Sequence, residues 1–438
     1  MARKMKDSGI AEIGAVPAEW KIFRIKFLLK DGIKSGPYGS SLKGKTLSTG
    51  EYPIYNQANV INGSFSLRRH YVSQANYEKM ESYHIHVGDI LFTMMGSVGR
   101  CCQVPENIPD GIIDSHLFEA RLNKLMLPQF FMYGYDKDNC SVVIDQFTRM
   151  MNGSIMDGLN GGLIKNASLP LPPLEEQSTI ISYLNCRCSS IDRTIFTTRQ
   201  SIEKLEEYKA SLITKAVTKG LNPMVEMQEV AEDWIGKMPE HWKYMRTKYL
   251  FEILKRIAGK KGYDILAITQ QGIKVKDIST NKGQIAADYS KYQLVYPGDF
   301  AMNHMDLLTG WVDLSDKMGV TSPDYRVFCK CSPLVYDKYY RYVFQNLYTT
   351  RVYYGLAQGV AEVGRKRLQA PTFRNFKLPV PPLDEQKAIV AYLDKETAAI
   401  DRLIAQKQQL IEKFTEYKQS LIYAAVTGKI DCREEASK

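Results

Sequence analysis

The residues from Gly39 to Thr46 have the types and spacing that could bind a nucleotide phosphate. They match the glycine-rich P-loop pattern, in which backbone N–H groups surround the phosphates and a lysine contacts them. That chemistry requires a buried strand before the loop and a helix after it. Here residues 34–38 predict a turn before the loop, and residues 48–53 contain a glycine and a proline that break a helix. We therefore expect no ATP site, although the loop could contact a DNA phosphate.

Elsewhere, no residues show the spacing of a catalytic or metal site. The eight cysteines are scattered, none forms a Cys-x-x-Cys pair, and no histidine stands at zinc-ligand spacing beside them. His84 and His86 alternate as on one side of a strand, for which polar residues at a sheet edge are the simpler interpretation. The sequence has no nucleophile elbow, dinucleotide fingerprint, amino-methylation loop or outstanding carboxylate pair. We expect reduced, mostly buried thiols, no catalytic residue and no metal site.

The composition is that of a globular chain with a modest excess of basic residues. Of the 438 residues, 44% are apolar, which suffices for buried cores and suggests two or three domains. The N-terminus lacks the apolar core of a signal peptide, and no apolar run approaches the ~18 residues of a membrane span. We therefore expect a cytoplasmic protein. The formal charge of +10 favours nucleic acid or a membrane surface as partner, the alternative being a merely well-solvated surface.

Basic and amide side chains cluster near predicted loops in two parts of the chain. Lysine and arginine neutralise phosphate, while asparagine, glutamine and arginine form paired hydrogen bonds with base edges. Singly, such residues are more often solvated surface charges, but the clusters together favour DNA binding. The first cluster comprises Lys34, Lys43, Lys45, Arg68, Arg69 and Arg100, with Gln57 and Asn59. The second comprises Lys255, Arg256, Lys260, Lys261, Lys274, Lys276, Arg365, Lys366 and Arg367, with Gln270 and Gln271.

Two segments of the sequence are duplicated. Residues 13–21 recur at 235–243, an offset of 235 − 13 = 222, and both copies contain Pro-x-x-Trp. A longer block begins with Leu-Pro-x-Pro-Pro-Leu-(Glu/Asp)-Glu-Gln at 169–177 and recurs from 378, an offset of 378 − 169 = 209. The segments between these landmarks share little similarity, and the first is longer by 222 − 209 = 13 residues. This pattern predicts a framework for a common partner and two divergent segments that bind different things.

The duplicated block predicts an extended segment followed by a long helix. Its prolines cannot lie inside a helix, so the helix should start near Leu174, where acidic residues suit the helix dipole. From residues 191 and 400 onward, apolar residues fit alternating steps of four and three, as in a coiled coil, and Gly220 and Gly428 stand where the helices would end. The apolar stripes are interrupted by polar Thr198, Lys209, Lys407 and Lys418. Neither helix can bury its stripe alone. We expect the two copies to pack against each other, antiparallel; two helices packed on separate domains is the alternative.

The two variable segments predict similar domains that differ in detail. Each is rich in Gly, Tyr, Ser and β-branched residues, and each has a Gly-Asp turn, at 88–89 and 298–299, that leads into a short strand. A strand introduced by a serine follows in both, from Ser115 and from Ser322. We expect each segment to be a compact α+β domain with a curved sheet.

This architecture resembles the specificity subunits of type I restriction–modification systems. The resemblance rests on the two proline-to-helix blocks, the Ile-Asp helices at 191–192 and 400–401 with their Ala-Val-Thr ends, and the Pro-x-x-Trp segments. Further matching segments are Gly-Pro-Tyr-Gly-Ser at 36–40, Gly-Asp-Ile-Leu-Phe-Thr at 88–93 and Gly-Leu-Asn at 158–160. The resemblance covers nearly the whole chain. One departure is the segment 359–365, which differs from 158–160, so the last loops of the two domains should differ.

The resemblance implies an α+β fold with two similar globular target recognition domains. They would be joined by two long helices that form an antiparallel coiled coil with pseudo-two-fold symmetry. The predicted limits are 1–168 for the first recognition domain, 169–220 for the first conserved helical block, 221–377 for the second recognition domain, and 378–438 for the second block and tail. Each recognition domain would read one half of a bipartite, asymmetric double-stranded DNA site, and the helices would set the spacer between the halves.

The resemblance also implies a non-catalytic subunit that helps dock two methyltransferase subunits, with restriction and translocase subunits in the larger complex. S-adenosylmethionine, ATP and magnesium would belong to those partners, so no cofactor is expected on this chain. The DNA-contacting residues predicted from the clusters and the resemblance together are Lys34, Ser35, Gly36, Tyr38, Ser40, Ser41, Lys43, Gln57, Asn59, Arg68, Arg69, Thr93, Ser97, Arg100, Lys260, Lys261, Gln270, Gln271, Lys274, Asn303, His304, Arg365 and Lys366.

Two other functions remain as alternatives from the sequence. One is a stand-alone nucleotide-using enzyme built on residues 39–46, and the other is a coiled-coil scaffold whose variable segments bind proteins. Incubation of the chain with ATP or S-adenosylmethionine and DNA distinguishes the enzyme from the DNA reader, and a gel shift with genomic fragments distinguishes the scaffold.

Overall fold

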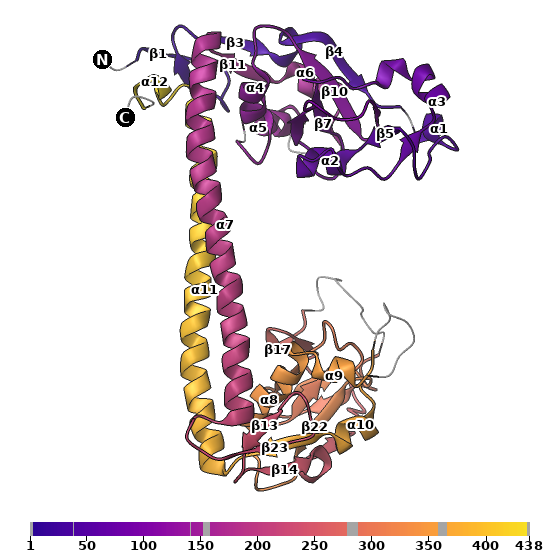
Figure 1. The fold of residues 1–438 in the computed structure, drawn as a ribbon, viewed down its shortest axis with the longest axis vertical. Helices are drawn as coiled ribbons and strands as arrows, with labels where there is room; N and C mark the ends of the chain where they lie inside the picture. Colours follow the sequence, from indigo (N-terminus) through magenta and orange to yellow (C-terminus); the bar gives the residue numbers. More distant parts are fainter. Residues whose placement is uncertain are drawn as a thin grey trace. The chain divides into compact units, whose positions relative to one another are not determined.

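The computed structural model describes residues 3–37, 39–140, 142–151, 158–277, 288–357 and 366–435, and it divides into two compact units (Figure 1). The first unit comprises residues 1–199 and 408–438, and the second comprises residues 200–407. Each unit therefore combines one variable region with the beginning of one long helix and the end of the other. The domain limits predicted above follow the sequence repeat instead and remain a proposal.

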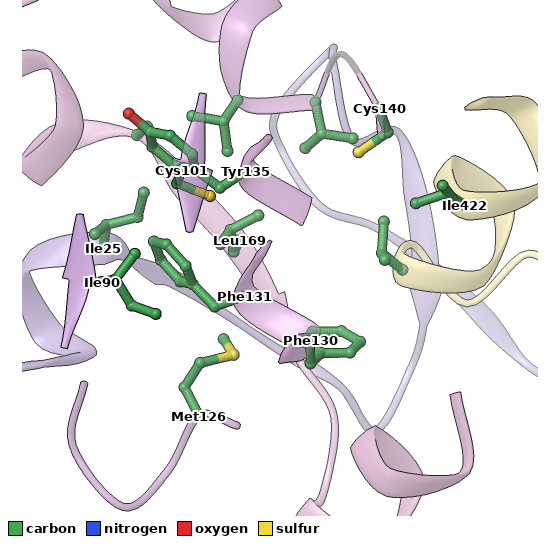
Figure 2. Packing of buried hydrophobic residues seen from close by; sticks show 14 of the residues in the cluster. Ile25, Ile90, Cys101, Met126, Phe130, Phe131, Tyr135, Cys140, Leu169 and Ile422 are labelled. Carbon is green, nitrogen blue, oxygen red and sulfur yellow. The ribbon is translucent and has the colours of Figure 1, made fainter. Parts of the chain in front are cut away.

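A four-stranded antiparallel sheet forms the centre of the first variable region. Its spatial order is β4 (Leu29–Ser35), β10 (Leu117–Leu122), β7 (Ile90–Thr93) and β8 (Cys101–Gln103). All four residues of β7 are buried because both faces of the sheet are covered. Ile90 and Phe92 belong to the large core shown in Figure 2, which includes Phe131 of helix α4 (Pro128–Tyr135). Leu91 belongs to a separate cluster on the other face.

The first unit contains further short helices and strands. They are β1 (Met5–Asp7), β2 (Ala15–Pro17), β3 (Lys21–Arg24), α1 (Gly39–Leu42), β5 (Tyr52–Tyr55), α2 (Gln57–Asn62), β6 (Tyr71–Val72), α3 (Gln74–Lys79), β9 (Ile112–Ile113), α5 (Val142–Met150), α6 (Gly161–Asn166), β11 (Ser168–Leu171) and α12 (Cys432–Glu435). The eight cysteines form no disulfide, and four of them, Cys101, Cys140, Cys188 and Cys432, are buried. This is a smaller share than the sequence analysis predicted.

The second variable region repeats the same sheet. Its order is β15 (Phe251–Leu254), β22 (Arg326–Lys330), β19 (Phe300–Met302) and β20 (Val312–Leu314). Both faces are again covered, since Phe300 and Met302 belong to one core and Ala301 to another. The other elements are β12 (Met227–Glu229), β13 (Lys237–Pro239), β14 (Lys243–Arg246), β16 (Leu266–Thr269), β17 (Gly272–Val275), β18 (Gln293–Val295), β21 (Gly319–Thr321), α8 (Asp337–Thr349), α9 (Val352–Gly355), α10 (Ala370–Asn375) and β23 (Lys377–Val380).

The predicted Gly-Asp turns have the same role in both sheets. The carboxylate of Asp89 accepts a hydrogen bond from the backbone N–H of His86 at 2.8 Å and pairs with Arg121 on β10. The carboxylate of Asp299 accepts from the backbone N–H of Tyr296 at 2.7 Å and pairs with Arg256. The predicted α+β character of the two variable regions, and their similarity, are confirmed.

The proline-rich lead-in of each duplicated block is a strand. β11 pairs with β3, and β23 pairs with β14, both antiparallel. The helices then begin where predicted: α7 spans Leu174–Lys219, and α11 spans Leu383–Val426. Gly220 and Gly428 follow in the left-handed conformation, with φ of +72° and +71°, which glycine adopts without strain at helix ends. Within the described ranges, no helix combines the length and apolarity needed to cross a membrane.

The long helices pack against each other in both units, with one equivalent ion pair in each. In the first unit, Lys418 of α11 lies 2.7 Å from Asp192 of α7. In the second unit, Lys209 of α7 lies 2.6 Å from Asp401 of α11. The repeat relates these pairs, because 192 + 209 = 401 and 209 + 209 = 418. The earlier residue of α7, Asp192, faces the later residue of α11, Lys418, and the later residue of α7, Lys209, faces the earlier residue of α11, Asp401. The antiparallel packing predicted from the coiled-coil spacing is therefore confirmed.

Each Pro-x-x-Trp segment holds the start of one long helix and the end of the other. The Trp20 indole N–H donates to Glu176 of α7 at 2.9 Å, and a Cβ added to Gly428 would lie 3.0 Å from the Trp20 ring. In the second unit, Trp242 donates to Glu385 of α11 at 2.9 Å. A Cβ added to Gly220, beyond the end of α7, would lie 3.1 Å from the Trp242 ring. The duplicated tryptophan, glutamate and glycine are thus explained by contacts within the chain.

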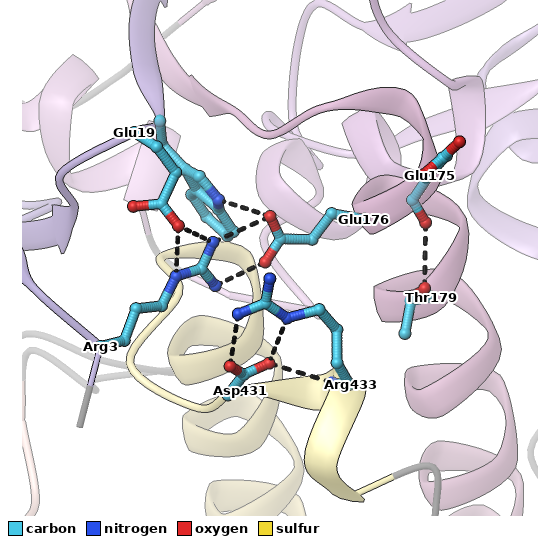
Figure 3. A network of polar contacts seen from close by, with 8 residues as sticks. Arg3, Glu19, Glu175, Glu176, Thr179, Asp431 and Arg433 are labelled. Carbon is cyan, nitrogen blue, oxygen red and sulfur yellow. Dashed lines mark hydrogen bonds and ion pairs between the residues drawn. The ribbon is translucent and has the colours of Figure 1, made fainter. Parts of the chain in front are cut away.

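Arginines from both chain ends reinforce this joint in the first unit (Figure 3). Arg3 donates to Glu176 at 2.9 Å and to Glu19 at 2.7 Å. Arg433 pairs with Asp431, and its positive charge also acts on Glu176. In the second unit, His241 lies 2.6 Å from the equivalent Glu385.

The glutamine that ends each duplicated motif is fully buried. The Gln386 amide donates to the carbonyl oxygens of Pro381 and Leu334, both at 2.8 Å, and its oxygen accepts from the backbone N–H of Tyr336 at 2.8 Å. Gln177 makes the same three bonds, with Pro172, Leu125 and Leu127. Each glutamine thus joins its helix to the proline lead-in and to the segment before helix α4 or α8.

Replacing Gln386 by alanine should destabilise the second unit. The substitution leaves the buried backbone groups without their hydrogen-bond partner. Each group left unsatisfied lowers the free energy of unfolding by roughly 1–3 kcal/mol. We expect a lower melting temperature of the full chain, measured by circular dichroism. Gln409→Ala, at an exposed position of α11, is the matched control and should melt like the unaltered chain. Equal melting temperatures for the two variants would contradict the assigned role.

Candidate nucleic-acid interface

The segment at residues 39–46 does not have the geometry of a P-loop. The turn predicted for residues 34–38 is wrong at Lys34 and Ser35, because both residues close strand β4. β4 is an edge strand, and the one-turn helix α1 lies before Lys43 and not after it. Lys43 is exposed in a turn. The described residues around this loop therefore form neither the buried strand before it nor the helix after it that a P-loop requires.

Several predicted DNA-contacting residues of the first unit are accessible. Lys34, Lys43, Arg68 and Arg69 are exposed, and Ser35, Ser41, Gln57, Ser97 and Arg100 are half-buried. Arg100 is partly neutralised, because it pairs with Asp136 at 3.2 Å and with Asp138. Tyr38 and Arg365 lie outside the described residues, as does the side chain of Ser40.

Three predicted contact residues in the first unit, Gly36, Asn59 and Thr93, are buried and already bonded within the chain. The Asn59 amide donates to the carbonyl oxygens of Ser64 and Leu67 and accepts from the backbone N–H of Asn56. The Thr93 hydroxyl donates to the Ser97 carbonyl oxygen at 2.6 Å. Gly36 donates its N–H to Leu117, and an added Cβ would lie 1.8 Å from the Asp114 carbonyl oxygen. Asn59 and Thr93 have no exposed surface, so a contact of either side chain with DNA would first require these bonds to break.

The described candidates of the second unit lie on four separate segments, at residues 260–261, 270–274, 303–304 and 366. Lys260 and Lys261 are exposed, and Lys366 lies over the Tyr354 ring at 4.2 Å. Gln270 and Gln271 form the two-residue turn between β16 and β17, where Lys274 donates to the Gln271 side-chain oxygen at 2.6 Å. The Gln270 side chain makes no hydrogen bond with any described residue.

Asn303 and His304 follow strand β19 and are half-buried. The Asn303 side chain accepts from the backbone N–H of Met305 at 3.3 Å. Burial and the charges of Arg326 and Arg367 lower the pKa of His304 to about 4, so this ring is neutral at pH 7. Its Nδ1 is buried and has no hydrogen-bond partner among the described residues. Asn303 and His304 therefore remain candidates as neutral hydrogen-bonding groups.

Arg326 is a buried cation that the sequence analysis did not single out. It is 5% exposed, its guanidinium donates to the Leu368 carbonyl oxygen at 2.9 Å, and it lies over the Phe373 ring. No described carboxylate pairs with it. Burial lowers its pKa to about 10, which leaves it charged at neutral pH. Arg326 holds the basic segment at 366–368 against β22. Arg326 stands at the start of the short strand β22, and nothing in the surrounding sequence indicated that its side chain is buried.

Within the described ranges, no group of three or more His, Cys, Asp and Glu side chains is placed to hold a metal ion. The accessible candidates are cations, amides and hydroxyls. Such side chains bind phosphates and base edges, so the described surface is suited to binding DNA.

Comparisons with known proteins agree with this assignment. A chain from a structure described as "Structural basis underlying complex assembly and conformational transition of the type I R-M system" has the same fold. Its TM-score is 0.68 at 14% identity, and the match covers 95% of this chain and 99% of that chain.

A family model described as "Type I restriction modification DNA specificity domain" matches residues 17–207 and 239–413. The chain belongs to this family, and its role is that of a DNA sequence-specificity subunit. It is 26% identical to the putative type I restriction enzyme MjaX specificity subunit of Methanocaldococcus jannaschii, over 96% of this chain and 95% of that protein. It is 24% identical to the type I restriction enzyme MjaVIII specificity subunit of the same organism, over 95% and 94%.

A buried carboxyl group lies beside the candidate Lys34. Glu119 on β10 is directly opposite Lys34 on β4 and is 5% exposed. Burial, followed by the negative charge of Asp89, raises its pKa from 4.5 to about 7. The folded state therefore binds this proton more tightly than the unfolded chain does. Its contribution to stability is complete below about pH 4.5 and is lost as the pH rises to about 7.

Glu119→Gln should stabilise the protein more at pH 8 than at pH 5. The amide imitates the protonated carboxyl, and the gain at pH 8 is at most about 3 kcal/mol, and less where water reaches the group. Melting temperatures of the two proteins at both pH values provide the measurement. Glu51→Gln, at an exposed position, is the control and should show no such difference. A pH-independent effect of Glu119→Gln would contradict the raised pKa.

Proposed function

We propose that the two variable domains each read one half of a bipartite, asymmetric DNA site and that the two long helices set the spacer between the halves. The observation that carries this proposal is the duplicated joint. Trp20 with Glu176 and Trp242 with Glu385 hold the two helices in the same way, while the accessible residues beyond them differ. A repeated framework with unlike surfaces suits a site whose halves have unlike sequences.

The proposed domains are residues 1–168 and 221–377 for recognition, with residues 169–220 and 378–438 as the helical blocks. We propose that these blocks help dock two methyltransferase subunits, and that restriction and translocase subunits join the larger complex. S-adenosylmethionine would supply the methyl group within the methyltransferase subunits, and ATP and magnesium would act in the motor and nuclease subunits. This chain would act on cytoplasmic DNA and would select the sequence without reacting with it.

Selection of random duplexes by the full chain, purified from its host with its associated subunits, tests the proposal. We expect a split consensus of two unlike halves separated by a gap of fixed length. Recovery of no consensus would refute DNA specificity and favour a protein-binding scaffold. ATP hydrolysis that depends on Lys45 of this chain would favour the nucleotide-using enzyme instead.

Exchange of residues 21–168 for the corresponding segment of another family member should change one half-site and leave the other half and the gap unchanged. The reason is that Gln177 and Gln386 lie outside the exchanged segment, and Gln177 bonds to Leu125 and Leu127 inside it only through their backbone groups, which any replacement segment also supplies. Sequencing of the selected duplexes provides the measurement, and the unexchanged chain is the control. A simultaneous change of both half-sites would contradict the modular arrangement.

The double variant Arg68→Gln/Arg69→Gln should weaken DNA binding and make it less dependent on salt. Both side chains are exposed, and each neutralised phosphate contributes about −0.9 to the slope of log K against log salt. We expect the slope to become shallower by as much as about 2. Lys4→Gln/Lys6→Gln, an equal change of charge at exposed positions near strand β1, is the matched control. Equal slopes for the two double variants would remove Arg68 and Arg69 from the interface.

A further inference from the structure

The second unit contains a concavity that brings three separate segments together. Its volume is about 370 Å³, and its lining includes Gln270, Leu308, Trp311 and Arg351. Gln270 belongs to the turn before β17, Leu308 and Trp311 to the loop between β19 and β20, and Arg351 to the junction of α8 and α9. Figure 1 shows β17 and α9 on the second unit. The sequence analysis named Gln270 but not Arg351 or Leu308.

Arg351 has an unusual backbone conformation and a free side chain. Its φ of +58° lies in the left-handed region, where a non-glycine residue costs of order 1 kcal/mol or more. Its backbone N–H donates to Tyr348 and its carbonyl oxygen accepts from Gly355, so the backbone is fixed between the two helices. The side chain is exposed, and its guanidinium has no hydrogen bond or ion pair with any described residue. A strained position that presents an unpaired cation indicates a functional constraint.

The other lining groups are held in fixed positions. The β16–β17 turn is closed by the Thr269 hydroxyl, which donates to the Gly272 carbonyl oxygen at 2.8 Å. The loop between β19 and β20 is fixed by Asp306, whose carboxylate accepts from the backbone N–H groups of Leu308 and Thr309, both at 3.0 Å. Leu308 therefore presents an apolar side chain that is 51% exposed beside an amide and a guanidinium.

We propose that this concavity reads a base pair in the DNA major groove, with Arg351 and Gln270 as specificity-determining residues of the second recognition domain. Arginine and glutamine form bidentate hydrogen bonds with guanine and adenine edges, and an apolar side chain contacts a thymine methyl group. A phosphate contact alone would need only a cation and would leave Gln270 and Leu308 without a partner. This inference rests on the proposed function, because it assumes that the second domain reads one half-site.

Selection of random duplexes by the full chain with its associated subunits, carrying Arg351→Asn, tests the inference. Asparagine tolerates the left-handed backbone, so this variant should fold and melt like the unaltered chain. We expect the preference for one base pair, or two adjacent ones, in one half-site to fall about tenfold or more, with the other half-site unchanged. Gln270→Ala should relax the same or the adjacent position.

Arg351→Lys separates base contact from phosphate contact. Lysine keeps the charge but lacks the planar fork, so it should relax the same position while leaving the salt dependence of binding unchanged. Gln406→Ala and Arg374→Asn, which alter an exposed amide of α11 and an exposed arginine of α10, are matched controls and should preserve the consensus.

Two results would overturn the inference. One is an unchanged consensus in both Arg351→Asn and Gln270→Ala. The other is a uniform loss of affinity in Arg351→Asn with an unchanged consensus, which would assign Arg351 to a phosphate. Both results count against the inference only where the unaltered chain selects a split consensus. If the unaltered chain selects no consensus, the proposed function itself fails, so the two failures are distinguishable.

Discussion

The buried glutamine at the first turn of each long helix joins three segments that would otherwise move independently. A helix start leaves backbone groups unsatisfied, and the prolines before it cannot donate hydrogen bonds. Gln177 bonds to the lead-in, to Leu125 and to Leu127, and Gln386 makes the same bonds in the second unit. Each recognition domain is therefore fixed to its helix by two of these hydrogen bonds, and the third holds the proline lead-in against the helix start. Residues beyond this joint can differ between the domains without disturbing it.

The ion pairs between the helices fix register more than they add stability. Asp192 and Asp401 are about half exposed, and pairs of that kind contribute little free energy. Their lysine partners interrupt the apolar stripes of the two helices, and a polar residue at such a position selects one alignment over its neighbours. The contacts of Trp20 and Trp242 likewise favour one alignment of the two helices at their ends. Together these contacts specify which residues of one helix face which residues of the other.

Most of the framework was predictable from the sequence because its signals are local. Proline, glycine and apolar periodicity act within a few residues, so the helix starts at Leu174 and Leu383 and the glycine ends were predicted where they lie. The candidate site was less predictable, because an amide or hydroxyl has the same sequence signal whether it is free or buried. Asn59 satisfies a turn several residues away, and Arg351 owes its conformation to the junction of two helices that the sequence did not delimit.

The first unit is discontinuous in the chain, and the second is continuous. Residues 200–407 are all synthesised before residues 408–438. The second unit therefore has every residue of its core while the core of the first unit still lacks Leu421, Ile422 and Val426. The order of synthesis thus makes the first unit the last to receive all the residues of its core.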